Sequence, residues 1–190
     1  MRITGGTLGG RVLVSPRDDR VRPTSDKVRQ AVFNVLRHRD FGSGPVVENA
    51  AVVDLFAGTG ALGLEAVSHG ARYALFVEDD AESRAVIRSN IETLGLTGTT
   101  KLWRRDATNL GPMPVGAGGP FGLVFLDPPY RKGMLLPALA SLLGNGWLEE
   151  GATLVAEVER EFSDVAPDAF RLVDDRVYGE TRILFLNLSK

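Results

Sequence analysis

A carboxylate, two prolines and an aromatic ring follow one another in Asp127-Pro128-Pro129-Tyr130, directly after the apolar run 121–126. An exocyclic amine on a nucleobase is a weak nucleophile because its lone pair is delocalised into the ring. Two acceptors can hold the amine hydrogens and turn the lone pair outward: the Asp127 carboxylate and the Pro128 carbonyl, which Pro129 stiffens. Tyr130 offers a ring on which an extruded base can stack. The motif therefore predicts a site that activates an amine by position and electrostatics.

Three glycines in the spacing G-x-G-x-x-G, Gly58, Gly60 and Gly63, follow a second apolar run at 51–56. Glycines in this spacing let the backbone turn tightly and approach a ligand at the start of a helix. Glu78 follows the next apolar run, where a carboxylate can accept hydrogen bonds from both ribose hydroxyls. This pattern predicts a turn that binds a nucleoside or a dinucleotide.

Asp54 distinguishes between these two ligands because it lies just before the glycine turn. A carboxylate at that place would repel a pyrophosphate. It would suit the ammonium and sulfonium groups of S-adenosylmethionine. The sequence therefore favours a methyl donor, and an NAD-dependent oxidoreductase is the alternative of a different class. An oxidoreductase function would not explain Asp54, residues 127–130 or the basic N-terminal residues.

The composition excludes several mechanisms. The 190 residues include no cysteine and two histidines, which excludes disulfides, thiolate metal sites and a cysteine nucleophile. We therefore expect no metal, and an amine target rather than pyrimidine C5, which normally requires a thiolate adduct. Since no apolar run approaches the ~18 residues that span a bilayer and no signal segment is visible, we expect a cytoplasmic protein away from membranes.

Positive charge is concentrated at the N-terminal end. Residues 1–40 hold nine Lys and Arg against four Asp, a balance of +5, whereas residues 41–190 balance at −7. A basic end on an acidic body predicts contact with a polyanion, and we expect 1–40 to form an RNA-binding extension of the catalytic domain 41–190. The candidate RNA-binding residues are Arg2, Arg11, Arg17, Arg20 and Arg22, with Arg131 and Lys132 beside the proline motif.

Strand and helix patterns alternate along most of the chain, which predicts an α/β fold with a mostly parallel sheet. Two short strands within 1–14 precede a helix capped by Thr24 or Ser25, whose charged residues Lys27, Arg29 and Arg37 need not be buried. The expected later elements are strands at 51–56, 73–77, 101–104, 121–126 and 152–156, helices at 61–69, 80–94 and 135–143, and an antiparallel hairpin of 170–177 and 181–188.

Five motifs carry a family resemblance: 2–13, which reads RITGGTLGGRVL, together with 22–29, 54–63, 127–133 and 145–148. With them the chain resembles the class I S-adenosylmethionine-dependent amino-methyltransferases. More narrowly, it resembles the RsmD family of bacterial 16S ribosomal RNA guanine-N2 methyltransferases. Residues 127–130 are typical of the whole amino-methyltransferase class, whereas the N-terminal motif is typical of the family.

The resemblance implies a Rossmann-like class I methyltransferase fold: a seven-stranded, mostly parallel sheet with a C-terminal antiparallel hairpin and a small N-terminal extension of a β-hairpin and a helix. It also implies S-adenosylmethionine as cofactor, S-adenosylhomocysteine as product, and contact of Asp106 with the adenine amino group. The candidate cofactor residues are Asp54, Phe56, Ala57, Gly58, Thr59, Gly60, Glu78, Asp79, Asp106 and Ala107. The candidate catalytic residues are Asp127, Pro128 and Tyr130.

The implied partner is 16S rRNA in the small ribosomal subunit or in an assembly intermediate, and we expect the protein to act as a monomer. Two alternatives stay open beside the oxidoreductase. Residues 127–130 would also serve an enzyme that methylates adenine N6 or another amine in DNA or RNA. An RNA-binding assembly factor that has kept the donor site without turnover is the second.

Overall fold

The computed structural model describes residues 1–15, 25–42 and 44–189. A seven-stranded sheet forms its centre, with strand order β3-β2-β1-β4-β5-β7-β6. The strands are β1 (Ala51–Leu55), β2 (Tyr73–Val77), β3 (Thr100–Trp103), β4 (Phe121–Leu126), β5 (Leu148–Glu159), β6 (Phe170–Tyr178) and β7 (Thr181–Leu188). The helices are η1 (Gly6–Leu8), α1 (Asp26–His38), α2 (Ala61–Ser68), α3 (Ala81–Leu94) and α4 (Leu135–Leu143).

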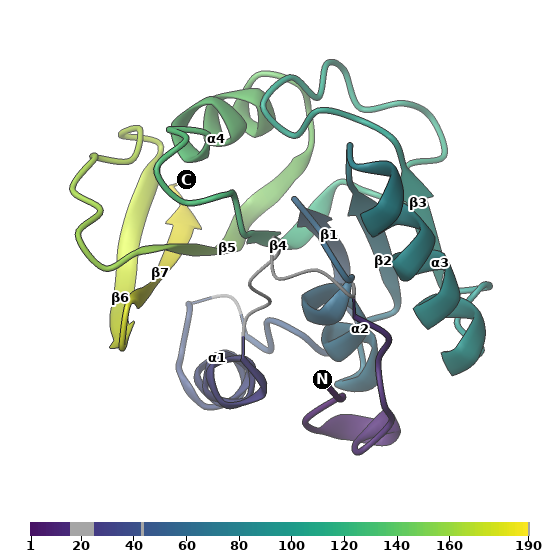
Figure 1. Cartoon of the computed structure of the whole chain (residues 1–190). Coiled ribbons are helices and arrows are strands. Elements are labelled where there is room, and N and C mark those ends of the chain that lie inside the picture. The colour runs from purple at the N-terminus through teal and green to yellow at the C-terminus, as the bar shows by residue number, and fades with distance from the viewer. Residues whose placement is uncertain (16–24, 43, 190) are drawn as a thin grey trace.

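Strands β1 to β5 pair in parallel, and β7 is antiparallel to both β5 and β6. The parallel strands therefore end at one common edge, which faces the viewer in Figure 1. The order along the sheet reverses between β1 and β4, and open α/β sheets bind ligands at such a switch point. The predicted mostly parallel sheet with its C-terminal hairpin is confirmed.

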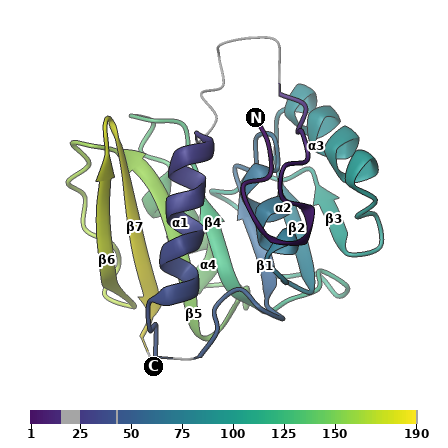
Figure 2. The ribbon, with the colours of Figure 1, turned by 90° about the horizontal axis from the view of Figure 1, so that it is seen from below.

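Helices cover both faces of the sheet. Helices α1, α2 and α3 lie on one face, and α4 lies on the other (Figure 2). Alternate residues of a strand therefore enter different cores: Val52 and Phe125 pack on the side of α1 to α3, whereas Val53 and Val124 pack on the side of α4. Strands buried on both sides explain why β1 and β4 read as continuous apolar runs.

The N-terminal segment differs from its prediction. The two strands expected within 1–14 are reduced to one antiparallel bridge between Arg2 and Val12, with η1 between them. The backbone N–H groups of Thr4 and Gly5 donate to the Glu65 carboxylate of α2 instead of to a neighbouring strand. Docking on α2 therefore replaces part of the expected hairpin.

Two further elements refine the expectations. The α1 cap is Ser25, whose hydroxyl accepts a hydrogen bond from the Val28 N–H at 3.2 Å. Strand β5 is longer than the expected 152–156, because Leu148 pairs with Phe121 at one end and Glu159 pairs with Thr181 at the other.

Within the three described ranges, no helix is long and apolar enough to cross a membrane. The same residues contain no group of three His, Cys, Asp or Glu side chains that could hold a metal ion.

Candidate active site

The glycine turn joins β1 to α2, and every second residue from 56 to 60 has a positive φ. Phe56, Gly58 and Gly60 have φ values of 56°, 55° and 77°. Gly60 is the N-cap of α2 in the left-handed region, where glycine is favoured. Gly63 is required for a different reason, since a Cβ there would lie 2.4 Å from Phe76 Cε1. The start of α2 is thereby held close against Phe76 of β2.

Asp54 lies beneath this turn. Its side chain is about 1% exposed, and its Oδ2 accepts a hydrogen bond from the Gly63 N–H at 2.9 Å. Burial raises the pKa of the Asp54 carboxyl to about 8; the Gly63 bond opposes the rise, and the charge of Glu78 adds to it. A cation placed beside the turn would favour the ionised carboxylate, so the site is suited to a positively charged ligand.

Glu78 follows β2 and holds the glycine turn by hydrogen bonds. Its Oε2 accepts from the Gly58 N–H and its Oε1 from the Asp80 N–H, both at 2.8 Å. Each carboxylate oxygen can accept more than one hydrogen bond, so both can also accept from ribose hydroxyls. Asp79 beside it is exposed, with its carboxylate 3.9 Å from Arg104 Nε.

Asp106 follows β3 on the next strand of the same edge. Its Oδ1 accepts hydrogen bonds from the Thr108 N–H at 2.8 Å and the Thr108 hydroxyl at 2.7 Å, while Ala107 is buried. The carboxyl group is exposed, as a contact with an adenine amino group would require. Asp54, Glu78 and Asp106 thus end three adjacent strands, β1, β2 and β3.

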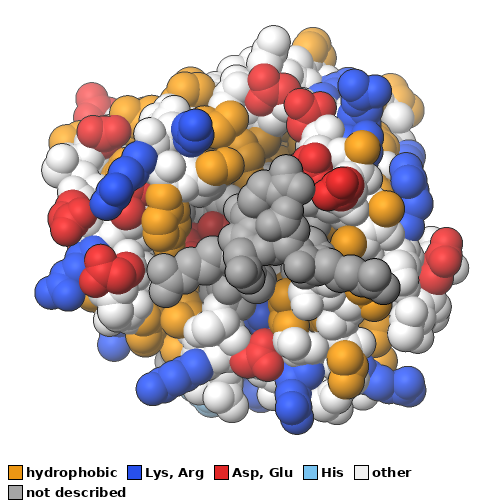
Figure 3. Space-filling view, viewed as in Figure 1, with side chains coloured by type: hydrophobic (Ala, Val, Ile, Leu, Met, Phe, Trp, Pro, Cys, Tyr) orange, Lys and Arg blue, Asp and Glu red, His pale blue; other side chains and the backbone are white. Residues whose placement is uncertain are grey.

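These residues fit the methyl donor better than a dinucleotide. The side chains around the turn are carboxylates, which accept hydrogen bonds from hydroxyls and attract cations but repel a pyrophosphate. Figure 3, viewed onto the same edge, shows acidic side chains gathered above and to the right of the grey atoms. S-adenosylmethionine has an ammonium, a sulfonium, a ribose and an adenine amine, and carboxylates are suitable partners for such groups.

The motif of residues 127–130 lies directly beside the donor turn, because β4 pairs with β1. Leu126 is the register partner of Leu55, and the Asp127 N–H donates to the Leu55 carbonyl at 3.4 Å. Pro128 is buried, whereas Pro129 is exposed. The acceptor groups predicted for an amine and the turn predicted for a methyl donor therefore meet at one point of the sheet edge.

The Tyr130 ring is fixed by its hydroxyl, which bonds to Glu157 Oε1 at 2.8 Å and to Thr181 Oγ1 at 2.9 Å. Burial raises the pKa of the Tyr130 phenol; the Thr181 bond opposes the rise, and the Glu157 carboxylate adds to it. The phenol therefore stays protonated. Strands β5 and β7 thus set the position of this ring, a role for Glu157 and Thr181 that no local sequence signal reveals.

The predicted RNA-binding residues fall into three groups. Arg2 and Arg11 are exposed on the N-terminal segment, and Arg2 Nε lies 4.0 Å from Asp26. Arg131 and Lys132 are exposed directly after Tyr130. Arg17, Arg20 and Arg22 lie outside the described residues. The structure therefore places basic side chains both on the N-terminal segment and beside Asp127.

The expectation that Arg29 need not be buried is wrong. Its side chain is fully buried, and its guanidinium bonds to Glu65 at 3.1 Å, to Asp26 at 2.8 Å and to the Arg2 carbonyl. Burial would raise the pKa of Glu65, but hydrogen bonds from His69, Thr4 and Arg29 hold it below its ordinary value. A single Glu within the apolar helix 61–68 is the signal that sequence reasoning passed over.

Asn90 of α3 was also missed. Its amide nitrogen donates to the carbonyls of Val14 and Thr59 at 3.1 and 3.0 Å, and its carbonyl accepts from the Val14 N–H at 2.7 Å. The side chain is about 1% exposed. It ties the N-terminal segment to the donor turn.

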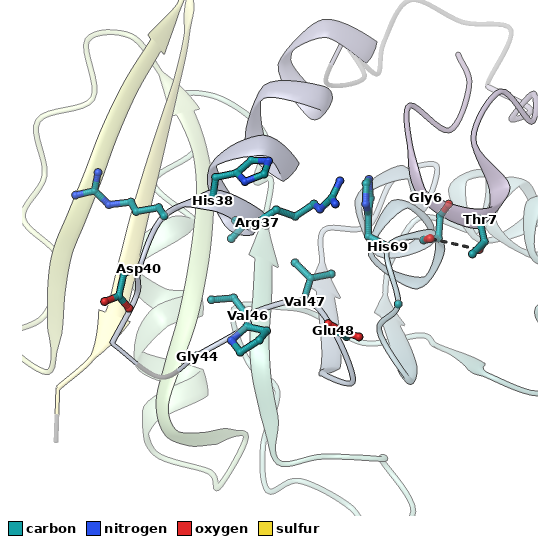
Figure 4. Close-up of a pocket in the computed structure, with 15 residues that line it drawn as sticks. Gly6, Thr7, Arg37, His38, Asp40, Gly44, Val46, Val47, Glu48 and His69 are labelled. Carbon is teal, nitrogen blue, oxygen red and sulfur yellow. Dashed lines mark hydrogen bonds between the residues drawn. The ribbon is translucent and has the colours of Figure 1, made fainter.

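A cavity of about 880 Å³ lies at the opposite edge of the sheet (Figure 4). Its walls come from the ends of α1 and α2 and from residues 44–48, which lead into β1. Figure 4 shows Arg37 and His69 pointing toward one another across it. None of the predicted catalytic or cofactor residues lines this cavity, so its size does not mark the site of the chemistry.

The sheet order, the glycine turn after β1 and Asp127-Pro128-Pro129-Tyr130 after β4 together define a class I methyltransferase with a Rossmann-like fold. The comparisons with known proteins agree with this class. The chain belongs to the family described as Conserved hypothetical protein 95, whose model matches residues 1–187.

Two curated relatives carry the same name. Ribosomal RNA small subunit methyltransferase D of Escherichia coli is 40% identical, over 95% of this chain and 86% of its own. The protein of that name from Haemophilus influenzae is 28% identical, over 94% and 89%. The solved structure of yhhF from Escherichia coli has a TM-score of 0.82 and 32% identity, and covers 100% of this chain and 98% of its own. The chain is thus an enzyme with methyltransferase activity.

Proposed function

We propose that this protein transfers a methyl group from S-adenosylmethionine to the exocyclic N2 amine of a guanine in 16S rRNA, within the small ribosomal subunit or an assembly intermediate. The observation that carries the proposal is the adjacency of Asp127 to the end of β1, which brings the amine-holding motif beside the donor turn. The name of the two relatives, ribosomal RNA small subunit methyltransferase D, supports this substrate.

The donor would be held by groups from three adjacent strands. Glu78 would accept hydrogen bonds from the ribose hydroxyls, and Asp106 would accept one from the adenine amine. Asp54, beneath the turn, would attract the positively charged ammonium and sulfonium groups. Phe56, Ala57, Thr59 and Gly60 supply the backbone of the turn, and Asp79 and Ala107 flank the carboxylates. When bound, S-adenosylmethionine supplies an electrophilic methyl group and leaves as S-adenosylhomocysteine.

The acceptor amine would be held by Asp127 and Pro128. The Asp127 carboxylate and the Pro128 carbonyl accept its two hydrogens, so that its lone pair points to the methyl group. The nitrogen forms the new bond to carbon, the bond from carbon to sulfur breaks, and the amine then loses a proton to solvent. The Tyr130 ring, fixed by Glu157 and Thr181, is the surface on which the extruded guanine stacks.

The rRNA backbone would be held by positive side chains on both sides of this site. Arg2 and Arg11 lie on the N-terminal segment, and Arg131 and Lys132 follow the motif. We assign residues 1–40, with Arg17, Arg20 and Arg22, to RNA binding and residues 41–190 to donor binding and catalysis. One copy carries every residue that the reaction uses, and such an enzyme would act as a monomer in the cytoplasm.

The test is a transfer assay with radiolabelled S-adenosylmethionine and four acceptors: small subunits from cells lacking the gene, their naked rRNA, duplex DNA, and buffer. We expect label in 16S rRNA, recovered as N2-methylguanine after digestion. Label in DNA alone would instead identify an adenine or cytosine amino-methyltransferase. Donor binding without transfer to any acceptor would favour the assembly factor.

A further inference from the structure

A second, smaller cavity lies directly beside the catalytic motif. It has a volume of about 220 Å³ and is bounded by two segments, the loop 128–135 after β4 and the end of β5 with the residues up to 164. Among the residues that line it are Pro129, Arg131, Leu135, Val158, Glu159 and Phe162. It thus opens at the same sheet edge as Asp127, on the side of β5.

The cavity has an apolar floor and a charged rim. Val158 and Leu135 are buried at its base, and Phe162 is half-buried and packs against the same core. Arg131 is exposed at the rim, with its guanidinium 4.0 Å from Glu161. Two carboxylates also line the cavity, the half-buried Glu159 and the exposed Asp164. An apolar floor with an aromatic ring suits the flat face of a nucleobase, and the two carboxylates can accept hydrogen bonds from its amine donors. Arg131 is the one cation among the lining residues and is therefore the group that can meet a phosphate.

Both walls of the cavity are held in place. The backbone of Phe162 is fixed from two sides, because its N–H donates to the Glu159 carbonyl at 3.0 Å and its carbonyl accepts from Arg182 at 2.6 Å. On the opposite wall Arg131 has a φ of 60°, a conformation that costs free energy for a residue other than glycine. Such strain is commonly retained where a side chain must point toward a ligand.

The occupant of this cavity is not the target base. The target amine must contact Asp127, and the target ring stacks on Tyr130; neither residue lines the cavity. Pro128, however, belongs both to the cavity wall and to the amine-holding pair. A base held here would therefore be a close neighbour of the target nucleotide along the RNA.

We propose that the cavity between the 128–135 loop and Phe162 binds the nucleobase next to the target guanine, with the base on the Phe162 ring and its phosphate at Arg131. This inference rests on the proposed function, since it takes RNA as the acceptor. Binding of the neighbouring base would hold the strand on one side of the extruded guanine and keep its amine at Asp127. Phe162 and Arg131 are then positioning residues for the RNA rather than catalytic ones.

The direct test replaces Phe162 by the photoreactive p-benzoylphenylalanine and irradiates the protein with small subunits from cells lacking the gene. The crosslinked nucleotide is mapped by primer extension, and the methylated guanine is mapped in parallel with the unsubstituted protein. We expect a crosslink to the nucleotide next to that guanine. A crosslink to the guanine itself, to a distant nucleotide or to ribosomal protein would overturn the inference, and so would no crosslink at all.

A kinetic test uses the same subunits without a photoreactive group. Phe162→Leu should raise the KM for subunits about 5-fold, the low end of the effect of losing one base–aromatic stack, with kcat and donor affinity little changed. Phe162→Trp should restore the KM. The matched control is Val165→Ala, in the same segment but 82% exposed and outside the cavity lining.

An unchanged KM in Phe162→Leu, or a loss of kcat that Phe162→Trp does not restore, would show that Phe162 only supports the fold. Thermal unfolding of each variant identifies a loss that is due to instability. If the unsubstituted protein methylates no rRNA, the proposed function fails. If the unsubstituted protein methylates rRNA and the KM of Phe162→Leu is unchanged, only the proposed neighbouring-base site fails.

Discussion

At the carboxyl edge of the sheet, the turn after β1 is closed by the carboxylates of Asp54 and Glu78, whereas much of the loop after β4 is exposed. Asp54 is buried, and the turn's Gly58 and Gly63 N–H groups are already bonded to carboxylates. Across the site, Pro129, Arg131 and Lys132 are exposed. A small cofactor makes few contacts that could offset the free-energy cost of ordering its site, so a preformed turn favours its binding. A large RNA can supply that ordering energy from many contacts.

The largest effect should come from Asp127→Ala, which removes the acceptor side alone. We expect about a 100- to 1,000-fold loss of transfer rate, because the amine loses one of the two groups that orient it. Donor affinity should change little, which single-turnover transfer and calorimetry can show separately. Asp127→Asn keeps an acceptor oxygen and should retain more activity. Near-normal activity of Asp127→Ala would contradict the proposed mechanism.

Gly63→Ala tests the closed side. Its methyl group would lie 2.4 Å from Phe76 Cε1 and 3.2 Å from Asp54 Oδ2, so the turn must move. We expect a loss of about 1–3 kcal/mol in the free energy of unfolding and weaker donor binding. The measurements are urea unfolding and calorimetry. Gly98→Ala is the control, because a Cβ there meets nothing within 4 Å; equal losses in the two variants would argue against a tightly packed turn.

Asp54 should make stability depend on pH. Its folded pKa is about 8 against an ordinary value of 3.8, so between these values the folded state holds one more proton than the unfolded chain. Its contribution is therefore complete below the ordinary pKa and is lost as pH rises toward 8, by at most about 1.4 kcal/mol per pH unit. Urea unfolding across this range should show a shallower fall for Asp54→Asn. Identical pH profiles would show that Asp54 is already ionised.

Arg11→Ala should have the smallest effect, and it tests the exposed side. Removing one phosphate contact should weaken RNA binding a few-fold and reduce the salt slope of log K by about 0.9. Filter binding at several salt concentrations measures both. Arg176→Ala is the control, because Arg176 lies outside residues 1–40 and is paired with Asp174 at 3.0 Å. The assignment of Arg11 fails if both variants keep the original slope.

Most of the fold could be predicted from the sequence because its strongest signals are local. Strands β2 and β4 and helix α4 have the expected bounds, since apolar runs between breakers depend on neighbouring residues. The adjacency of β1 and β4 was not predicted, because no local pattern specifies the order of strands in a sheet. The N-terminal strands failed as strands because Glu65, distant in sequence, competes for their N–H groups.

The site shows the same division. The types of Asp54, Glu78 and Asp127 and their places at strand ends pointed to the chemistry, and the structure brings these strand ends together. What could not be predicted depends on contacts between distant segments: the Asn90 bonds to Val14 and Thr59, and the Glu157 and Thr181 bonds that fix Tyr130. Such isolated residues belong to no local sequence motif, so the sequence alone does not indicate their contacts.

The hydrogen bonds of the Glu65 carboxylate on α2 determine what an N-terminal truncation of the chain would lose. It accepts hydrogen bonds from Thr4 and Gly5 while paired with the buried Arg29. In thermodynamic terms, residues 4 and 5 are a tethered ligand, present at high effective concentration because the chain carries them. A truncated enzyme would keep the Arg29–Glu65 pair but lose this ligand, and a peptide of the missing residues added in solution would have to bind without the benefit of the tether.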